Sequence, residues 1–115
     1  MRDAKERLQD ILEAITNIER YAVRGRVAFE TDELIQNWFL RQLLIIGEAA
    51  RALPQDVIAL TPLIPWAKII GMRNILVHGY FEIDTEVVWD AVTSDIPALK
   101  PHIEDLLRKL EQRKT

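Results

Sequence analysis

The sequence predicts an all-α protein, an up-and-down bundle of four to five helices in one domain that covers residues 1–115. Apolar residues recur three and four positions apart along most of the chain, which is the spacing of one face of a helix. No stretch carries a convincing strand pattern, and the 115 residues include only four Gly and five Pro. With 49% hydrophobic and 29% charged residues, the composition is that of a folded, mostly helical protein.

Charge and cysteine content exclude several classes of protein. The net charge of −3 and the pI near 5.4 argue against a protein that coats nucleic acid, so any RNA contact must be local. Without cysteine there is neither a disulfide framework nor a thiolate metal site, and with two His we expect no metal and no cofactor. The charged N-terminus and the absence of a long apolar run predict a soluble, cytoplasmic protein that does not contact a membrane.

The first predicted helix starts after Asp3, a plausible N-cap, and ends near residues 21–22. Its apolar stripe consists of Leu8, Ile11, Leu12, Ile15 and Ile18. The following stretch VRGRVAFETD reads as a loop around Gly25. Arg24 and Arg26 in this loop are expected to be solvated or to contact an RNA backbone.

The second predicted helix is capped by Thr31 or Asp32, runs to Leu53 and stops at Pro54. Two of its faces carry large side chains. The first face consists of Phe39, Leu43, Ile46, Ala50 and Leu53, and the second of Trp38, Arg41, Ile45 and Glu48. A chain this short forms a single hydrophobic core, and one face of the helix is enough to pack against it. A second covered face therefore predicts a partner subunit, most simply in a homodimer.

The stretch PQDVIALTPLIPW is predicted to be a connector with one short helical turn, which leads into a third helix that starts near Pro65 and includes Gly71. After Gly79 a helix restarts with Asp84 as its N-cap. Its buried stripe is expected at Val87, Val88, Ala91 and Val92.

The last helical stretch contains Pro97 and Pro101, which are expected to kink or split it, with Ser94 or Asp95 capping the continuation. Its stripe continues through Ile96, Leu99, Ile103, Leu106, Leu107 and Leu110 to a basic tail, RKLEQRKT, that is expected to fray.

Residues 73–80 read RNILVHGY, an apolar stretch that also contains polar side chains able to bind a phosphate group. On a helix, Asn74 and His78 lie on one side, while Arg73 lies roughly 140° round from His78. Arg73 and His78 of one chain therefore do not converge. Two copies that meet about a two-fold axis at these helices place Arg73 and His78 of both chains along one cleft.

These groups suit metal-free RNA cleavage. Gly79 fits the C′ position of a helix, so His78 falls in the last turn, where the helix dipole favours imidazolium. His78 can activate the 2′-hydroxyl for attack on the adjacent phosphorus, while Arg73 holds the phosphate and Asn74 supports the developing charge. DNA lacks this hydroxyl and is spared.

Each of these residues also has an interpretation without catalysis. The spacing R-x4-H is a weak signal by itself, since His78 can simply complement the helix dipole. Glu48 can pair with Arg41 or Arg51 on its own helix, or it can orient Arg73.

The remaining aromatic and His residues also have structural roles. Tyr80 can be an ordinary aromatic at the bundle edge. The three Trp residues (Trp38, Trp66 and Trp89) are predicted to lie in the core or a dimer interface, and His102 on the surface.

The longer stretch IPWAKIIGMRNILVHGYFEIDTEVVW, with LLIIGEAARALP before it, resembles the HepT group of toxin ribonucleases in the HEPN superfamily, and the resemblance covers nearly the whole chain. It implies an all-α homodimer with composite active sites at the interface, built from Arg73 and His78. It also implies a toxin–antitoxin pair, in which a small MNT-type nucleotidyltransferase antitoxin adenylylates Tyr80 and can form a higher hetero-oligomer with the toxin. Gly79 departs from the pattern, since many relatives carry a larger residue there.

Two functions follow. The first is a metal-independent endoribonuclease toxin with Arg73 and His78 as catalytic residues, Asn74 and Glu48 in support and Tyr80 as the modified residue. The second is a non-catalytic helical binding module that serves as substrate and docking partner of a nucleotidyltransferase.

Overall fold

The computed structural model describes residues 3–71 and 84–113, and within these ranges the chain forms helices and connecting turns without a strand. The helices are α1 (Ala4–Ala22), α2 (Gly25–Thr31), α3 (Glu33–Arg51), α4 (Gln55–Ile58), a helical stretch over residues 66–71, α6 (Thr85–Asp90), the π-helical turn η1 (Ala91–Asp95) and α7 (Ile96–Arg113). The all-α prediction is therefore confirmed.

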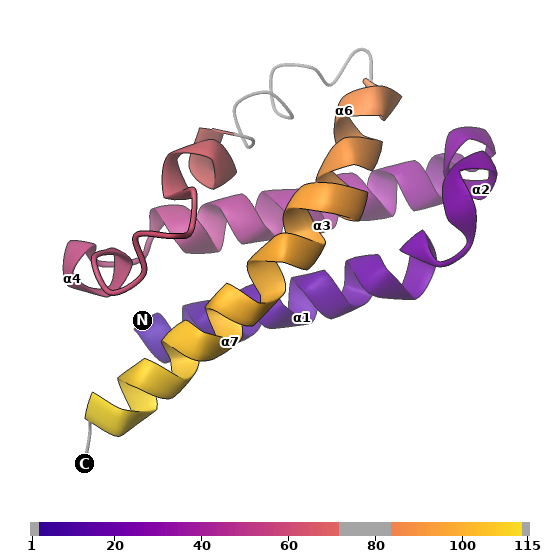
Figure 1. The fold of residues 1–115 in the computed structure, drawn as a ribbon. Helices are drawn as coiled ribbons and strands as arrows, with labels where there is room; N and C mark the ends of the chain where they lie inside the picture. Colours follow the sequence, from indigo (N-terminus) through magenta and orange to yellow (C-terminus); the bar gives the residue numbers. More distant parts are fainter. Residues whose placement is uncertain (1–2, 72–83, 114–115) are drawn as a thin grey trace.

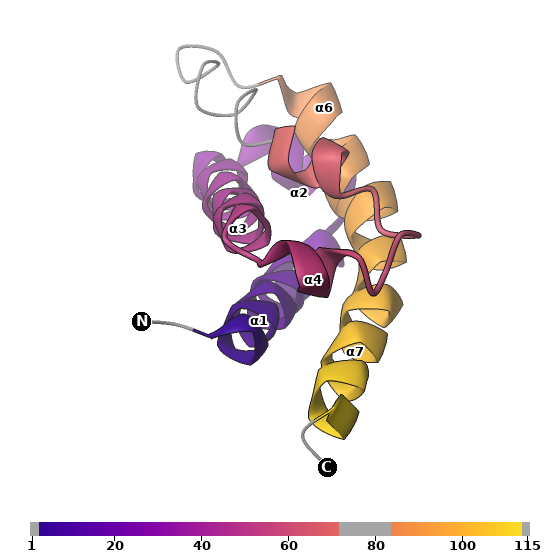
Figure 2. The same ribbon diagram turned by 90° about the vertical axis from the view of Figure 1, so that its left-hand side faces the viewer.

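The long helices α1 and α3 lie side by side and run in opposite directions, joined by α2 at one end (Figure 1). α7 crosses α1 at an angle, and α4 with the connector covers the other end of the pair (Figure 2). Apolar side chains from all of these elements form one continuous core. Leu8, Ile11, Ile15, Ile18, Phe39, Ile103 and Leu106 are fully buried in it.

The predicted starts of α1 and α3 are confirmed by their caps. Asp3 and Glu6 form a capping box, in which the Glu6 N–H donates to Asp3 Oδ1 at 2.8 Å and the Asp3 N–H donates to Glu6 Oε1 at 3.3 Å. Asp32 caps α3 by accepting from the Leu34 N–H at 2.9 Å. α3 ends at Arg51, slightly before the predicted end, and Leu53 is buried just beyond it.

The prediction of a loop over residues 23–32 is wrong, because residues 25–31 form the helix α2. Gly25 has a φ of 90°, a left-handed conformation that turns the chain sharply after α1 at little steric cost. Phe29 is the buried residue of α2 and stacks between Phe39 and Trp89, with ring centroids 5.5 and 5.4 Å away. A helix with one core residue has no repeating apolar stripe, which explains why the sequence pattern did not reveal it.

Of the two alternatives predicted for Pro97 and Pro101, a split of the helix is wrong, because α6, η1 and α7 follow one another as one continuous helical rod (Figure 1). Neither Ser94 nor Asp95 caps a new helix. The turn before Pro97 is π-helical, with the Ile96 N–H donating to the Ala91 carbonyl five residues back. This wider turn accommodates a proline that lacks an N–H and would crowd the preceding turn.

Two smaller predictions about this rod also need correction. Val87 is 39% exposed, while Val88, Ala91 and Val92 are buried as expected. The basic C-terminal stretch does not fray at its start, since α7 continues through Arg113.

The connector prediction is confirmed. α4 is its short helical turn, and a helix begins directly after Pro65 and includes Gly71. The course of this helix beyond Gly71 lies outside the described residues.

Candidate active site and its two anchors

The four residues of the predicted site that lie in residues 73–80 fall outside the described residues. They are Arg73, Asn74, His78 and Tyr80, so their geometry, and the expected role of Gly79, stay predictions. Glu48 is the predicted site residue that the structure describes. It lies exposed on α3, as do Arg41 and Arg51, and its pairing with any of the three predicted Arg partners stays a prediction.

The second face of α3 is partly covered by α1 of the same chain. Trp38 is half-buried, its indole N–H donates to the Asn17 carbonyl at 3.0 Å, and its ring meets Tyr21 edge-on with centroids 6.0 Å apart. The Asn17 side-chain amide also donates to Oε1 of the buried Gln42 at 3.2 Å. Contacts within the chain therefore cover the Trp38 end of this face, whereas Arg41 and Glu48 are exposed.

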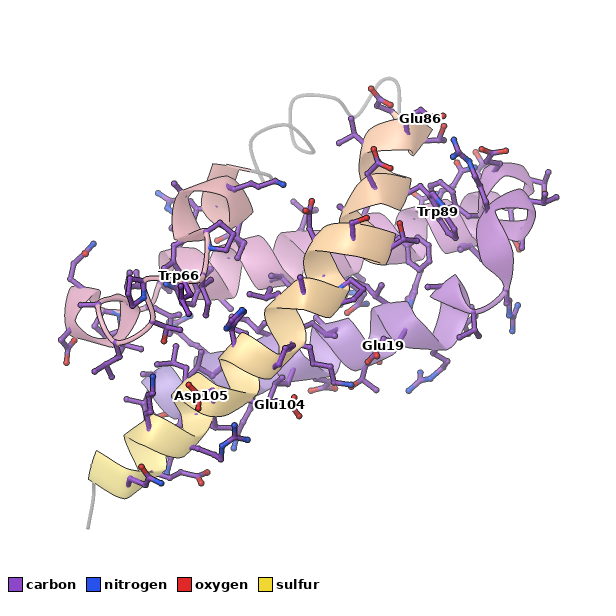
Figure 3. All side chains as sticks on the ribbon, in the orientation of Figure 1. Glu19, Trp66, Glu86, Trp89, Glu104 and Asp105 are labelled. Atoms are coloured by element: carbon purple, nitrogen blue, oxygen red, sulfur yellow. The ribbon has the colours of Figure 1, made fainter. Side chains whose placement is uncertain are left out.

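The stretch that carries the predicted site leaves the described fold at Gly71 and returns at Asp84, and each end is fixed by a set of contacts. The leading anchor consists of Trp66, Lys68 and Ile69 with their partners. Trp66 and Ile69 are buried, and the Trp66 indole N–H donates to the Thr61 carbonyl at 3.2 Å (Figure 3). Lys68 Nζ lies 3.0 Å from Asp95 Oδ1, which ties this helix to η1.

The trailing anchor consists of Asp84, Glu86 and Trp89 with their partners. Asp84 is the N-cap of α6, as predicted, and accepts from the Val87 N–H at 3.2 Å. Half-buried Trp89 stacks on Phe29 of α2 with ring planes 25° apart. Figure 3 shows Glu86 and Trp89 on α6, at the end of the rod that faces α2.

Arg26 completes the trailing anchor: it is exposed, as expected, but it pairs with two carboxylates, and a contact with an RNA backbone stays a prediction. Its Nε donates to Glu30 Oε1 at 2.6 Å within α2, and its Nη2 donates to Glu86 Oε1 at the start of α6. The hydrogen bonds to Glu30 and Glu86 raise the pKa of the Arg26 guanidinium. Arg24 is exposed and sits over the Tyr21 ring, 4.7 Å from its centroid.

Sequence reasoning missed both of these charged links. The spacing of Arg26 and Glu30, four residues apart, becomes informative only once α2 is known to be a helix. Glu86 lies 60 residues from Arg26 and Asp95 lies 27 residues from Lys68, so no local pattern connects either pair.

Residues 3–71 and 84–113 contain no group of three or more His, Cys, Asp or Glu side chains suited to holding a metal ion. No helix in these ranges is both long and apolar enough to cross a membrane.

Comparison with known proteins adds the family. The family model described as "Ribonuclease HepT-like" matches residues 11–106, a range that includes the RNILVHGY stretch and both anchors. A protein named probable ribonuclease HepT from Thermococcus cleftensis is 42% identical over 108 residues, which cover 91% of this chain and 96% of the relative. A Methanocaldococcus jannaschii protein with a provisional RNase name is 36% identical over 104 residues, which cover 90% of this chain and 95% of the relative.

A longer Methanocaldococcus jannaschii protein, named as a gamma-glutamylcyclotransferase and provisionally as an RNase, is 36% identical over 114 residues, which cover 98% of this chain but 51% of the relative. No solved structure gives a significant match. The family model covers well over half of the chain and the first relative aligns along nearly its whole length. The chain belongs to the HepT-like ribonuclease family.

Proposed function

We propose that this protein is a metal-independent endoribonuclease, the toxin of a toxin–antitoxin pair. The observation that carries the proposal is the family match over residues 11–106, a range that includes RNILVHGY. Relatives named as ribonucleases align over nearly the whole chain and support RNA as the substrate. The net charge of −3 favours a local site over a broad basic surface.

The proposed reaction needs no metal. His78 takes the proton of the 2′-hydroxyl, the 2′-oxygen attacks the adjacent phosphorus, and the 5′-oxygen leaves with a proton returned by imidazolium. Arg73 binds the phosphoryl oxygens through two N–H groups, and Asn74 donates to the same developing charge. The products are a 2′,3′-cyclic phosphate and a 5′-hydroxyl.

The proposed site is composite and lies between two copies of the chain. On the second face of α3, Arg41 and Glu48 are exposed and Ile45 is only partly buried against the core, whereas the first face is buried, which supports a partner there. In the proposed dimer this face and the helix that leads into RNILVHGY form the seam, and Glu48 orients Arg73.

Tyr80 is the proposed point of control. An MNT-type nucleotidyltransferase antitoxin transfers adenylyl groups from ATP to its phenol oxygen, which displaces pyrophosphate. The phosphodiester adds bulk and negative charge two residues from His78. It competes with RNA for Arg73 and inhibits the nuclease.

Cleavage of single-stranded RNA in EDTA tests the reaction. The parent protein should release 2′,3′-cyclic phosphate ends and leave the matching DNA intact, whereas His78→Ala and Arg73→Gln should cleave at least about a hundredfold more slowly. Arg108→Gln, on the exposed side of α7, is the matched control and should cleave normally. Strict dependence on Mg²⁺, or full activity of His78→Ala, would reject the mechanism.

Mixing the two inactive variants tests the composite site. If Arg73 and His78 act across the dimer interface, re-associated mixtures of Arg73→Gln and His78→Ala should regain about a quarter of the parent activity, because half of the dimers are mixed and each has one intact site. A mixture that stays inactive would place both residues of a site in one chain.

Co-expression with an MNT-type nucleotidyltransferase separates the proposal from the alternative, a non-catalytic substrate and docking module. Intact mass should show added adenylate on the parent protein and on Tyr21→Phe, but not on Tyr80→Phe. Modification of a parent protein that never cleaves RNA would favour the binding module. Equal modification of Tyr80→Phe would move the acceptor elsewhere.

A further inference from the structure

A cavity lies between the leading anchor and the helical rod. Its volume is about 160 Å³, and it separates the connector and the helix over residues 66–71 from the rod formed by η1 and α7. The lining residues on the first side are Leu63, Pro65, Lys68 and Ile69, and those on the second are Asp95, Ile96, Ala98, Leu99 and His102. The first group of lining residues comes shortly before Arg73 in the sequence.

The cavity combines an apolar floor with a polar rim. Ile69, Ile96 and Leu99 are nearly fully buried and form the floor, whereas Leu63 is 78% exposed at the mouth. Lys68 and Asp95 face each other across the rim, with Lys68 Nζ 3.0 Å from Asp95 Oδ1, and half-buried His102 adds a ring nitrogen. An apolar slot with a few polar groups at its edge is the usual form of a small-ligand site.

Size restricts the occupant. An apolar cavity of about 150 Å³ in another protein holds one benzene molecule, so this one holds a single six-membered ring and not a helix of a partner protein. The rim requires that this ring carry polar atoms at its edge. A carboxylate accepts from an amino or imino group, while an ammonium donates to a carbonyl oxygen.

We propose that this cavity binds one pyrimidine base of the RNA substrate. The proposal rests on the proposed ribonuclease function and names a specificity site for it. The ring lies flat against Leu99 and Pro65, Lys68 donates to the O2 carbonyl that cytosine and uracil share, and Asp95 accepts from the N4 amine or the N3–H. The second ring of a purine would have to remain outside the cavity, which favours a pyrimidine.

The position in the chain fits this role. Lys68 lies five residues before Arg73, which binds the scissile phosphate in the proposed reaction. Five trans peptide steps span at most about 19 Å between Cα atoms, so the length of the chain limits how far Lys68 can lie from Arg73. A base near the cleaved bond is therefore the part of the RNA that reaches the cavity.

A cavity-filling variant provides the test. Ala98 is exposed and lines the cavity, so Ala98→Leu fills it without removing a core contact. Ala67→Leu is the matched control, because Ala67 is an exposed residue of the facing helix that does not line the cavity. Asp95→Asn, which keeps the shape and removes the charge, is a second variant that does not depend on filling.

Binding is measured by fluorescence anisotropy with 2′-O-methyl oligouridine, oligocytidine and oligoadenosine, which cannot be cleaved through the 2′-oxygen. The parent and Ala67→Leu should prefer the pyrimidine oligomers about tenfold, which is the discrimination expected of one good polar base contact. Ala98→Leu should lose this preference with oligoadenosine binding unchanged, and Asp95→Asn should change the ratio of cytidine to uridine binding.

The outcomes separate this proposal from the proposed function. A parent protein that cleaves RNA without a pyrimidine preference, or an Ala98→Leu variant that keeps the preference, would overturn the pyrimidine site and leave the ribonuclease intact. Pyrimidine binding that Ala98→Leu abolishes, in a protein that cleaves no RNA, would support the site and reject the nuclease. Loss of nucleotidyltransferase binding in Ala98→Leu with base preference unchanged would make the cavity a protein-docking site instead.

Discussion

The two anchors that flank the predicted catalytic stretch hold the chain in different ways. In the leading anchor, buried Trp66 and Ile69 pack against the core, and the Trp66 indole bonds to Thr61 only five residues away. In the trailing anchor, Trp89 and Glu86 depend on Phe29 and Arg26 of α2, about 60 residues earlier. The leading anchor therefore combines a local hydrogen bond with packing against the core, while the side chains of Glu86 and Trp89 in the trailing anchor rely on a short helix far away in the sequence.

The largest expected effect comes from breaking the trailing anchor at its apolar centre. Phe29→Ala leaves a cavity between Phe39 and Trp89 and should cost about 3–5 kcal/mol of unfolding free energy, measured by urea denaturation. Hydrogen exchange should accelerate more in α6 than in residues 66–71. Val27→Ala, at a position 74% exposed in the same helix, is the control and should change stability by less than about 0.5 kcal/mol.

The leading anchor should respond less to its own polar change. Trp66→Phe keeps most of the ring but removes the donor to the carbonyl of buried Thr61, so it should cost about 1–3 kcal/mol in the same measurement. Trp38→Phe removes a similar hydrogen bond at a half-buried position and should cost less, because water can replace the donor. A larger loss for Trp38→Phe would mean that burial does not decide the difference.

Two helix N-caps, Asp84 in the trailing anchor and Asp3 at the start of α1, separate an effect on stability from an effect on catalysis. Asp84→Ala and Asp3→Ala each remove one helix N-cap and should each cost about 1 kcal/mol. Asp84 borders the stretch that contains His78, so only its replacement should slow RNA cleavage, by a few fold in kcat, if the proposed function holds. Equal kcat values for the two variants would show that the trailing anchor does not position the site.

The smallest effects should come from the charged links. Arg26→Gln removes two exposed ion pairs and Lys68→Gln removes one, so each should lower the urea midpoint slightly at low salt and not measurably at high salt. The pKa of Arg26 is raised in the fold, so its contribution is fully present below the ordinary Arg range and is lost only above it. The Arg26→Gln difference should therefore stay constant across neutral and mildly alkaline pH, and a change there would point to another titrating group.

Much of the fold could be predicted because its signals are local. The helix starts at Asp3, Asp32 and Asp84 depend on a side chain that bonds within its own first turn, and the sequence predicted Asp3 and Asp84 directly and Asp32 as one of two candidates. The core faces of the long helices repeat every three to four residues, so they were also visible, with the exception of exposed Val87. Family membership was recognisable for a similar reason, since RNILVHGY and its surroundings form one contiguous stretch.

The tertiary structure decided what depends on residues far apart in the chain. In α2, Phe29 packs against Phe39 and Trp89. Neither partner lies within the seven residues of α2, so the sequence of this helix alone does not reveal the contacts that hold it. The rod continues past Pro97 because the π-helical turn before it accommodates a residue without a backbone N–H. The general rule that proline interrupts a helix does not predict this turn. The cavity beside the Lys68–Asp95 ion pair likewise arises only when segments 27 residues apart pack together, since free volume is a property of packing and not of any one segment.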